Sequence, residues 1–228
     1  MEIQLSDHFT YKKLIKFVLP SIVMMIFTSI YGVVDGLFVS NFAGKTAFAA
    51  INLIMPILMG LSALGFMIGT GGSAIVATTL GEGKKEKANE YFSMLVYATI
   101  IGGIAVSLLG MILIRPIAVM LGAAGELLSD CVLYGRITFI SFPAFMLQNV
   151  FQSFFVAAQK PKLGLKVIIV AGVTNMVLDY VFVGCLGFGI AGAAVATVCG
   201  EFIGGLFPIF YFARKNSSLL KLGRPSFD

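Results

Sequence analysis

Long runs of apolar residues, separated by short polar segments, dominate the chain. A helix needs ~20 apolar residues to cross the hydrocarbon core of a bilayer, and the sequence contains six such runs. We expect helices near residues 17–42, 50–80, 91–114, 137–158, 167–186 and 190–212. The separators carry turn residues and charge, notably at 81–87, 159–162 and 187–189. The pattern predicts an all-α, polytopic membrane protein with a bundle of six transmembrane helices.

Composition agrees with this class. Hydrophobic residues make up 58% of the chain, charged residues 12%, and the mean hydropathy is +0.98. The first run follows a basic stretch and is too long for a cleaved signal peptide. Cys131, Cys185 and Cys199 are far apart and His8 is the only histidine, so we expect neither a disulfide framework nor a Cys/His metal site.

The positions of lysine and arginine predict the orientation, because short cytoplasmic loops carry the excess of these residues. With six crossings, three of the 16 lie on one side, namely Lys45, Arg115 and Arg136. The other thirteen share the opposite side: Lys12, Lys13, Lys16, Lys84, Lys85, Lys87, Lys160, Lys162, Lys166, Arg214, Lys215, Lys221 and Arg224. We therefore expect a multi-pass protein of the cell membrane with both termini in the cytoplasm. The net charge of +5 then reflects topology and anionic lipid heads rather than nucleic acid.

Three acids interrupt the apolar runs and are the first candidates for function. Asp35, Asp179 and Glu201 all lie within predicted helices, where a charge costs at least ~2.5 to 3.5 kcal/mol. Asp35 and Asp179 each precede the outer end of a helix by about seven residues, and Thr197 follows one by about as many, which puts all three roughly 10 Å deep. We expect them to meet.

Asn175 precedes Asp179 by four residues and so shares its helix face. Two carboxylates, an amide and a hydroxyl at one depth suit a proton or a small cation such as Na⁺. For Asn175 and Thr197 alone, interhelical hydrogen bonds are the competing interpretation. Glu201 lies one turn inward of Thr197 and could extend a proton path, line a substrate cavity, or serve only as a protonated structural residue.

Several short motifs, taken in order, resemble the MATE family of multidrug and toxic compound extrusion transporters. They are Leu19-Pro20, Val34-Asp35-Gly36, the glycine motifs at 69–72 and 81–83, Gln159-Lys160-Pro161, the run from Asn175 to Tyr180, and the run 187–197. The resemblance spans nearly the whole chain and is to the prokaryotic branches. It implies that Asp35, Asn175, Asp179 and Thr197 hold the coupling ion, H⁺ or Na⁺.

The resemblance also implies an antiporter that exports lipophilic or cationic drugs and needs no cofactor. Family members have twelve helices in two six-helix lobes, with the drug cavity between them. We therefore interpret residues 1–213 as an N-terminal lobe and 214–228 as a basic cytoplasmic linker or tail, with a C-terminal lobe missing. A half-size transporter that pairs with a second copy is the alternative.

Three further residues have candidate roles. Pro20 removes a backbone hydrogen bond and could hinge the first helix, or produce only a static kink. Gln148 and Gln152 could contact substrate in the cavity, or form hydrogen bonds between helices.

An enzyme is not expected. Paired intramembrane aspartates also occur in aspartyl proteases of the membrane, but the Tyr-Asp and Gly-x-Gly-Asp motifs of that family are missing at Asp35 and Asp179. No glycine-rich phosphate loop with lysine is present. Transport coupled to an ion gradient is the preferred hypothesis, and a pore-forming or structural membrane protein is the third possibility.

Overall fold

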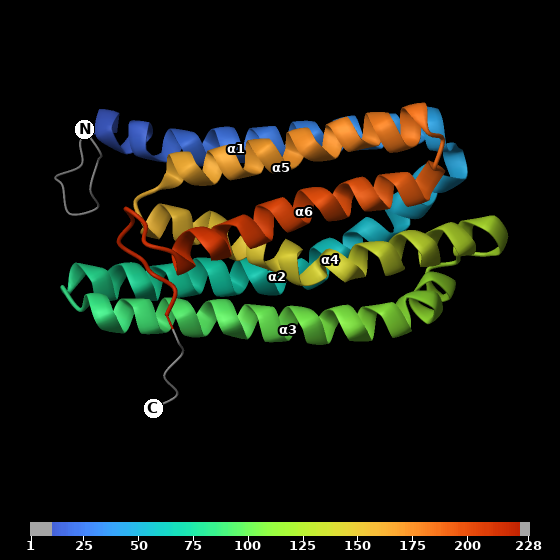
Figure 1. Ribbon diagram of the computed structural model, residues 1–228. Coiled ribbons are helices and arrows are strands. Elements are labelled where there is room, and N and C mark those ends of the chain that lie inside the picture. Colours follow the sequence, from blue (N-terminus) through green and yellow to red (C-terminus); the bar gives the residue numbers. More distant parts are fainter. Residues whose placement is uncertain (1–10, 224–228) are drawn as a thin grey trace.

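The structure, a computed structural model, describes residues 11–223 and is almost entirely helical. Its elements are α1 (Tyr11–Phe38), the π-helical turn η1 (Val39–Ala43), α2 (Lys45–Gly81), α3 (Lys85–Met120), α4 (Gly125–Ala157), α5 (Pro161–Asp179), the π-helical turn η2 (Tyr180–Cys185) and α6 (Gly189–Ala213). The six expected helices are all present (Figure 1).

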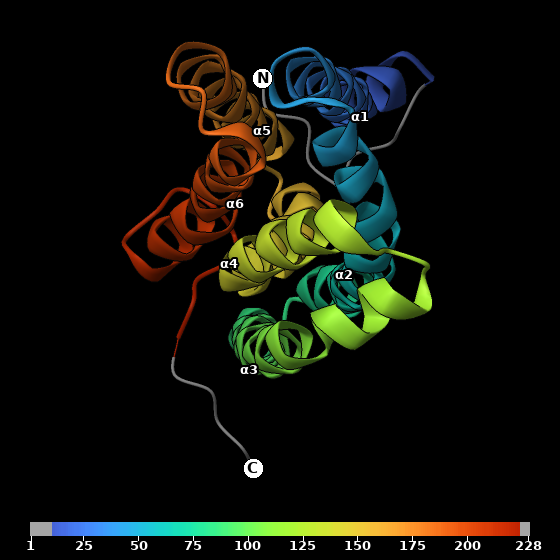
Figure 2. The ribbon, with the colours of Figure 1, turned by 90° about the vertical axis from the view of Figure 1, so that its right-hand side faces the viewer.

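The helices run along a common long axis, with α4 at the centre (Figures 1 and 2). α4 packs against α2, α3 and α6, while α5 joins α6 to α1. In the most apolar stretch of α4, 67% of residues are buried, against 17% in α1. α4 is therefore the core of the bundle, and α1 is a peripheral helix held chiefly by α5.

Small residues let the helices approach to backbone contact. A Cβ added to Gly65 of α2 would lie 2.9 Å from the Met146 carbonyl oxygen of α4, and one on Gly69 would lie 3.0 Å from the Val150 Cα. Because lipid removes the hydrophobic drive between helices, such close packing is a main source of their association.

Several helices extend beyond the expected runs. α3 begins at Lys85 and ends at Met120, where 91–114 was expected, and α4 begins at Gly125 rather than near residue 137. The physical reason is that apolar runs mark only the part inside the hydrocarbon core, whereas backbone hydrogen bonding continues through polar residues at the ends. The ends of α2 and α6 fall close to the expected positions.

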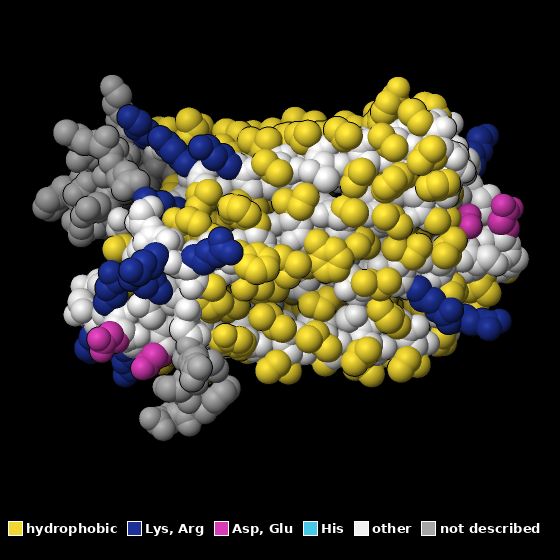
Figure 3. All heavy atoms as spheres, in the orientation of Figure 1, with side chains coloured by type: hydrophobic (Ala, Val, Ile, Leu, Met, Phe, Trp, Pro, Cys, Tyr) yellow, Lys and Arg dark blue, Asp and Glu magenta, His cyan; other side chains and the backbone are white. Residues whose placement is uncertain are grey.

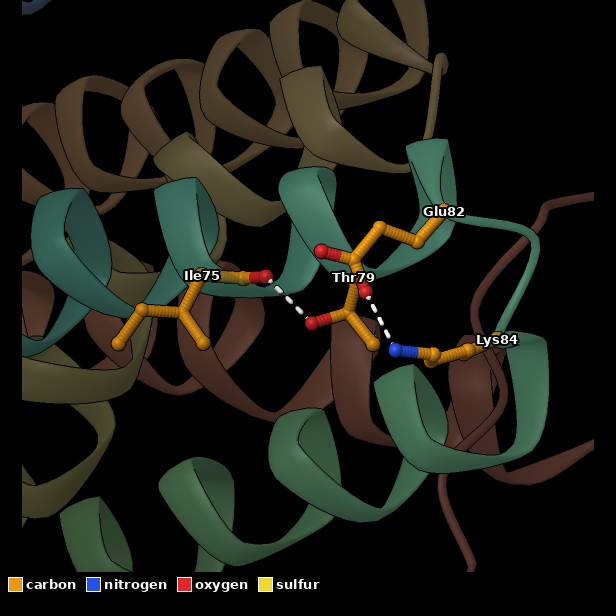
Figure 4. Close-up of polar contacts among 4 residues, drawn as sticks. All are labelled: Ile75, Thr79, Glu82 and Lys84. Atoms are coloured by element: carbon orange, nitrogen blue, oxygen red, sulfur yellow. Dashed lines mark hydrogen bonds and ion pairs between the residues drawn. The ribbon is translucent and has the colours of Figure 1, made fainter.

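A tight turn joins α2 to α3 at the basic end of the bundle. Gly83 adopts a positive φ of 78°, and Lys84 Nζ donates to Glu82 Oε2 at 2.8 Å (Figure 4). The last turn of α2 also holds Thr79, whose hydroxyl donates to the Ile75 carbonyl at 2.8 Å (Figure 4). The hydrogen bond from Lys84 lowers the pKa of Glu82. Because this ion pair is fully exposed, water screens it and it contributes little to stability.

Charged side chains gather at the two ends of the bundle, and an apolar belt covers its middle (Figure 3). All six helices are long and apolar enough to cross a membrane. The belt and the charged ends have the arrangement of a bundle whose sides face lipid and whose ends face water.

The segment after α6 folds back against α3. The Leu222 amide donates to the Phe212 carbonyl at 2.8 Å, and the Lys221 amide donates to Asn89 Oδ1 at 2.9 Å. Gly223 is held in the same way by Ser93 Oγ at 2.9 Å. Of the expected linker or tail at 214–228, the part near residues 220–223 thus lies against the bundle, Arg214 and Lys215 are exposed, and 224–228 are outside the described residues.

Candidate functional site

Polar side chains gather inside the bundle, where α1, α4, α5 and α6 surround them. Asp179 is 0% exposed, Asn175 4%, Gln148 5% and Asp35 7%. Buried polar groups in proteins are normally hydrogen-bonded, yet each of these residues has a side-chain atom without a hydrogen-bond partner among the described residues. Such unpaired groups, concentrated in one place, mark a candidate binding site.

Asp35 and Asp179 form the centre of this site, as expected. Their carboxyl groups lie next to each other between α1 and α5. Gly172 makes the approach possible, since a Cβ there would lie 2.7 Å from Phe27 and 2.9 Å from Tyr31 of α1. Within residues 11–223, no donor reaches either oxygen of Asp179 or Oδ1 of Asp35. Two adjacent buried carboxylates repel each other unless a proton or a cation is shared between them.

Asn175 and Thr197 are the other two expected members. Asn175 lies one turn before Asp179 on the buried face of α5, and its Oδ1 has no partner within the described part of the chain. The Thr197 hydroxyl donates to the Ala193 carbonyl at 3.0 Å, as in an ordinary helix. Tyr134 of α4 lies beside Thr197 and near both aspartates, so it links the two parts of the site.

The chemistry of the unpaired atoms favours a positively charged ligand. Five are acceptor oxygens: Oδ1 of Asp35, Oε1 of Gln148, Oδ1 of Asn175 and both carboxyl oxygens of Asp179. The other two are the Tyr134 hydroxyl and Asn149 Nδ2. An unsatisfied buried acceptor costs ~1 to 3 kcal/mol, and a proton or a hard cation would remove several of these penalties together.

A π-helical turn follows each aspartate. η1 begins at Val39, four residues after Asp35, and η2 begins at Tyr180, directly after Asp179. The two turns touch, and Phe38 meets Tyr180 edge to face at a centroid distance of 6.4 Å. π-Helical turns occur frequently at functional sites, and here both carboxyl groups lie next to a change in helical hydrogen bonding.

Glu201, Gln148 and Gln152 lie on the facing surfaces of α4 and α6 or near them. Glu201 is half-buried and its Oε2 accepts a hydrogen bond from the Ser141 hydroxyl at 2.5 Å. The Gln148 side chain packs against Gly204, and a Cβ at that position would require Gln148 to shift. Gln152, one turn further along α4, is half-buried.

Pro20 is separate from this cluster. It lies fifteen residues before Asp35 in α1, about 22 Å along the helix axis. α1 is continuous through Pro20, and a hinge at this position stays a prediction.

Three residues of the site were not among the sequence candidates: Tyr31, Tyr134 and Ser141. Tyr31 precedes Asp35 by four residues and therefore shares its face of α1. Tyr134, Ser141 and Gln148 follow one another at intervals of seven along α4, which places them in one stripe. That spacing of polar residues in a transmembrane segment was the available signal.

Known proteins with similar sequences support this architecture. The MatE family profile matches residues 20–181. The chain is 30% identical over 209 residues to the multidrug export protein MepA of Staphylococcus haemolyticus, covering 92% of this chain and 46% of that protein. It is 27% identical over 220 residues to MepA of Staphylococcus aureus strain MRSA252, with coverages of 95% and 49%.

Solved structures agree. An outward-facing multidrug resistance MATE family transporter superposes with a TM-score of 0.87 at 26% identity, over 95% of this chain and 49% of that one. An inward-facing structure, also described as a MATE family transporter, gives 0.80 at 26% identity, over 87% and 46%. The chain spans about half the length of the relatives it matches. A six-helix membrane bundle with this likeness, matched by the family profile over most of its length, belongs to the MatE family.

Proposed function

We propose that this chain is the cation-binding N-terminal lobe of an antiporter that exports organic, chiefly cationic, drugs in exchange for H⁺ or Na⁺. The observation that carries the proposal is the pair of adjacent buried carboxyl groups of Asp35 and Asp179, three of whose four oxygens have no donor among the described residues. The names of the relatives, multidrug export proteins, support the substrate class. The chain's coverage of about half of each relative supports its place as one lobe.

The proposed mechanism uses the charge of the aspartate pair. With a proton or Na⁺ bound, the repulsion between the carboxyl groups is cancelled and α1 can pack closely on α5. Loss of the ion restores the repulsion between the two carboxyl groups. Because α1 is a peripheral helix that packs chiefly on α5, few other contacts oppose its movement away from α5. Ion binding therefore favours one arrangement of α1 over another, which is the differential interaction that coupling requires.

The remaining members have supporting roles in this proposal. The Asn175 carbonyl oxygen and the Thr197 hydroxyl oxygen supply neutral ligands, as suits Na⁺. Tyr134 carries a hydroxyl that can relay a proton between the aspartates and Thr197. Gln148 and Gln152 are proposed to contact substrate from α4.

The proposed setting is the cell membrane, with both termini and the loops at Lys85 and Lys162 in the cytoplasm. The excess of lysine and arginine at one end of the bundle supports this orientation. The partner is a second six-helix lobe, across which substrate binds and against which this lobe rocks. A second copy of this chain is the alternative partner.

Cation binding by the purified chain tests the proposal directly. Thermal unfolding is measured in NaCl and in KCl of equal concentration, and proton release is measured as the pH is raised. We expect a Na⁺-specific stabilisation or a titrating proton that disappears in Asp35→Asn and in Asp179→Asn. The control is Glu90→Gln, which removes an exposed acid of α3. If neither ion's binding depends on the aspartate pair, the coupling role is wrong.

A further inference from the structure

The contact between Ser141 and Glu201 joins α4 to α6, two helices that pack closely against each other. The Ser141 hydroxyl is fully buried in α4 and lies 2.5 Å from Glu201 Oε2 of α6. It also lies 3.1 Å from the Thr138 carbonyl oxygen of its own helix. Ser141 therefore has two acceptors within reach and a single proton to donate.

This geometry satisfies both protonation states of Glu201. When Glu201 is ionised, the Ser141 hydroxyl donates to it in a short, charge-assisted hydrogen bond. When Glu201 is protonated, its O–H donates to Ser141 Oγ, and the serine proton turns to the Thr138 carbonyl. The change needs only rotation of one hydroxyl, so the proton can bind and leave without movement of the backbone.

Close packing on the next turns holds the two groups in place. No Cβ could fit at Gly205, which lies on the backbone of Ala144, and the neighbouring Gly204 lies against the end of the Gln148 side chain. α4 and α6 are therefore in backbone contact just beyond the Ser141–Glu201 pair. The two helix backbones are thus already in contact beside this pair, and rotation of the Ser141 hydroxyl accommodates a change of charge on Glu201 without moving them.

A second observation points to a ligand here. Oε1 of Gln148 is buried, has no hydrogen-bond partner among residues 11–223, and lies against Gly204, one turn from Glu201. The titratable groups that face Glu201 are Tyr31 from α1 and Tyr134 from α4. Tyr31 also lies near Asp35, and Tyr134 lies near Asp35 and Asp179. Within residues 11–223 no three acids, histidines or cysteines are close enough to share a metal ion, so Glu201 is separate from the aspartate pair.

We propose that Glu201 and Ser141 form a second proton-binding site, distinct from the Asp35–Asp179 pair and joined to it by Tyr31 and Tyr134. The site takes up a proton on Glu201 and releases it again, while Ser141 exchanges donor for acceptor. Its use in transport rests on the proposed antiport function: a lobe with two such sites can carry a proton at Glu201 while the aspartate pair holds Na⁺ or another proton.

Infrared difference spectroscopy of the purified chain in lipid tests this site without any transport measurement. A protonated carboxyl group has a C=O stretching band that an ionised one lacks. We expect a titrating band that is lost in Glu201→Gln and kept in the Asp35→Asn/Asp179→Asn double variant. Ser141→Ala removes the acceptor of the acid proton, so the same band is expected to move to higher frequency.

The controls separate this site from the rest of the protein. Glu90→Gln should leave the band unchanged, and circular dichroism should show equal helix content in all variants. If Glu201→Gln fails to fold, the Ser141→Ala shift alone decides. A wild-type spectrum in which no band depends on Glu201 or Ser141, or one whose Glu201 band never titrates, would overturn the proposal. Loss of ion coupling with a normal Glu201 band would instead count against the proposed function alone.

Discussion

Asp179 is completely buried, and in the part of the chain that the structure describes neither of its carboxyl oxygens has a donor, although a buried carboxylate normally accepts several hydrogen bonds. Its neighbour Asp35 supplies another acid rather than a base. The pair is thus arranged at the expense of stability, and such residues in a membrane segment mark ion pathways. Because both groups are acids, neither neutralises the other, and the net charge of the site changes with each proton or cation that binds.

Replacing either aspartate by asparagine is expected to abolish gradient-driven efflux while the protein stays folded. Asparagine keeps the volume of the side chain but cannot bind and release a proton. Dye efflux from vesicles, with H⁺ and Na⁺ gradients imposed separately on this lobe joined to its second lobe, measures the effect. Wild-type efflux in either variant, at equal expression, would move the coupling site elsewhere. Glu90→Gln serves as the matched acid control.

At the scale of the helices, the sequence predicted what crosses the membrane but not which faces meet. The six apolar runs correspond to α1 to α6, because burial in lipid requires apolar length whatever the packing. Apolar patterning carries little information about helix faces, since lipid-facing and buried positions are both apolar. The central place of α4 was for this reason not evident, and its early start at Gly125 was missed.

The candidate site was predictable from the sequence where its residues are charged or strongly polar and lie inside apolar runs. Asp35 and Asp179 were expected to meet, and they do, because equal depth on adjacent helices is readable from the topology. Ser141 was missed because serine is common in transmembrane helices and its partner Glu201 lies sixty residues away. Only tertiary packing of α4 on α6 brings these two together.

Glycine contacts between α2 and α4 are expected to be critical for stability. Gly65→Ala places a methyl group against the backbone of Met146, and such overpacking costs ~1 to 3 kcal/mol. Gly102→Ala in α3 is the matched control, since nothing described lies within 4 Å of its added Cβ. Thermal unfolding in detergent compares the two. Equal melting temperatures would show that α2 can move away from α4 at no cost.

On the scale of the whole molecule, the charged ends and the apolar belt give an orientation that can be tested. A cysteine at position 85, in a background without Cys131, Cys185 and Cys199, is expected to react with an impermeant reagent only from the cytoplasmic side. A cysteine at position 45, at the other end, should react only from outside. Labelling of position 85 from outside in intact cells would contradict the predicted orientation.

The lobe alone is expected to fold but not to export drug. Its helices satisfy their own backbone hydrogen bonds, but one bundle has only one wall of the proposed cavity and nothing to rock against. Residues 1–228 are expressed in cells without their own efflux pumps, with and without a co-expressed C-terminal lobe, and dye efflux is measured. Strong efflux from the short chain alone would favour a half-size transporter that pairs with itself.

The segment after α6 is fixed to the bundle some distance from the end of that helix. Leu220 is fully buried, and the amides of Lys221 and Gly223 are held by Asn89 and Ser93 of α3. Chain that continues past Gly223 therefore departs from a fixed point on the bundle instead of trailing from the end of α6. A tilt of the bundle would therefore carry this starting point with it, so that the position of the following chain depends on the orientation of α3 as well as on that of α6.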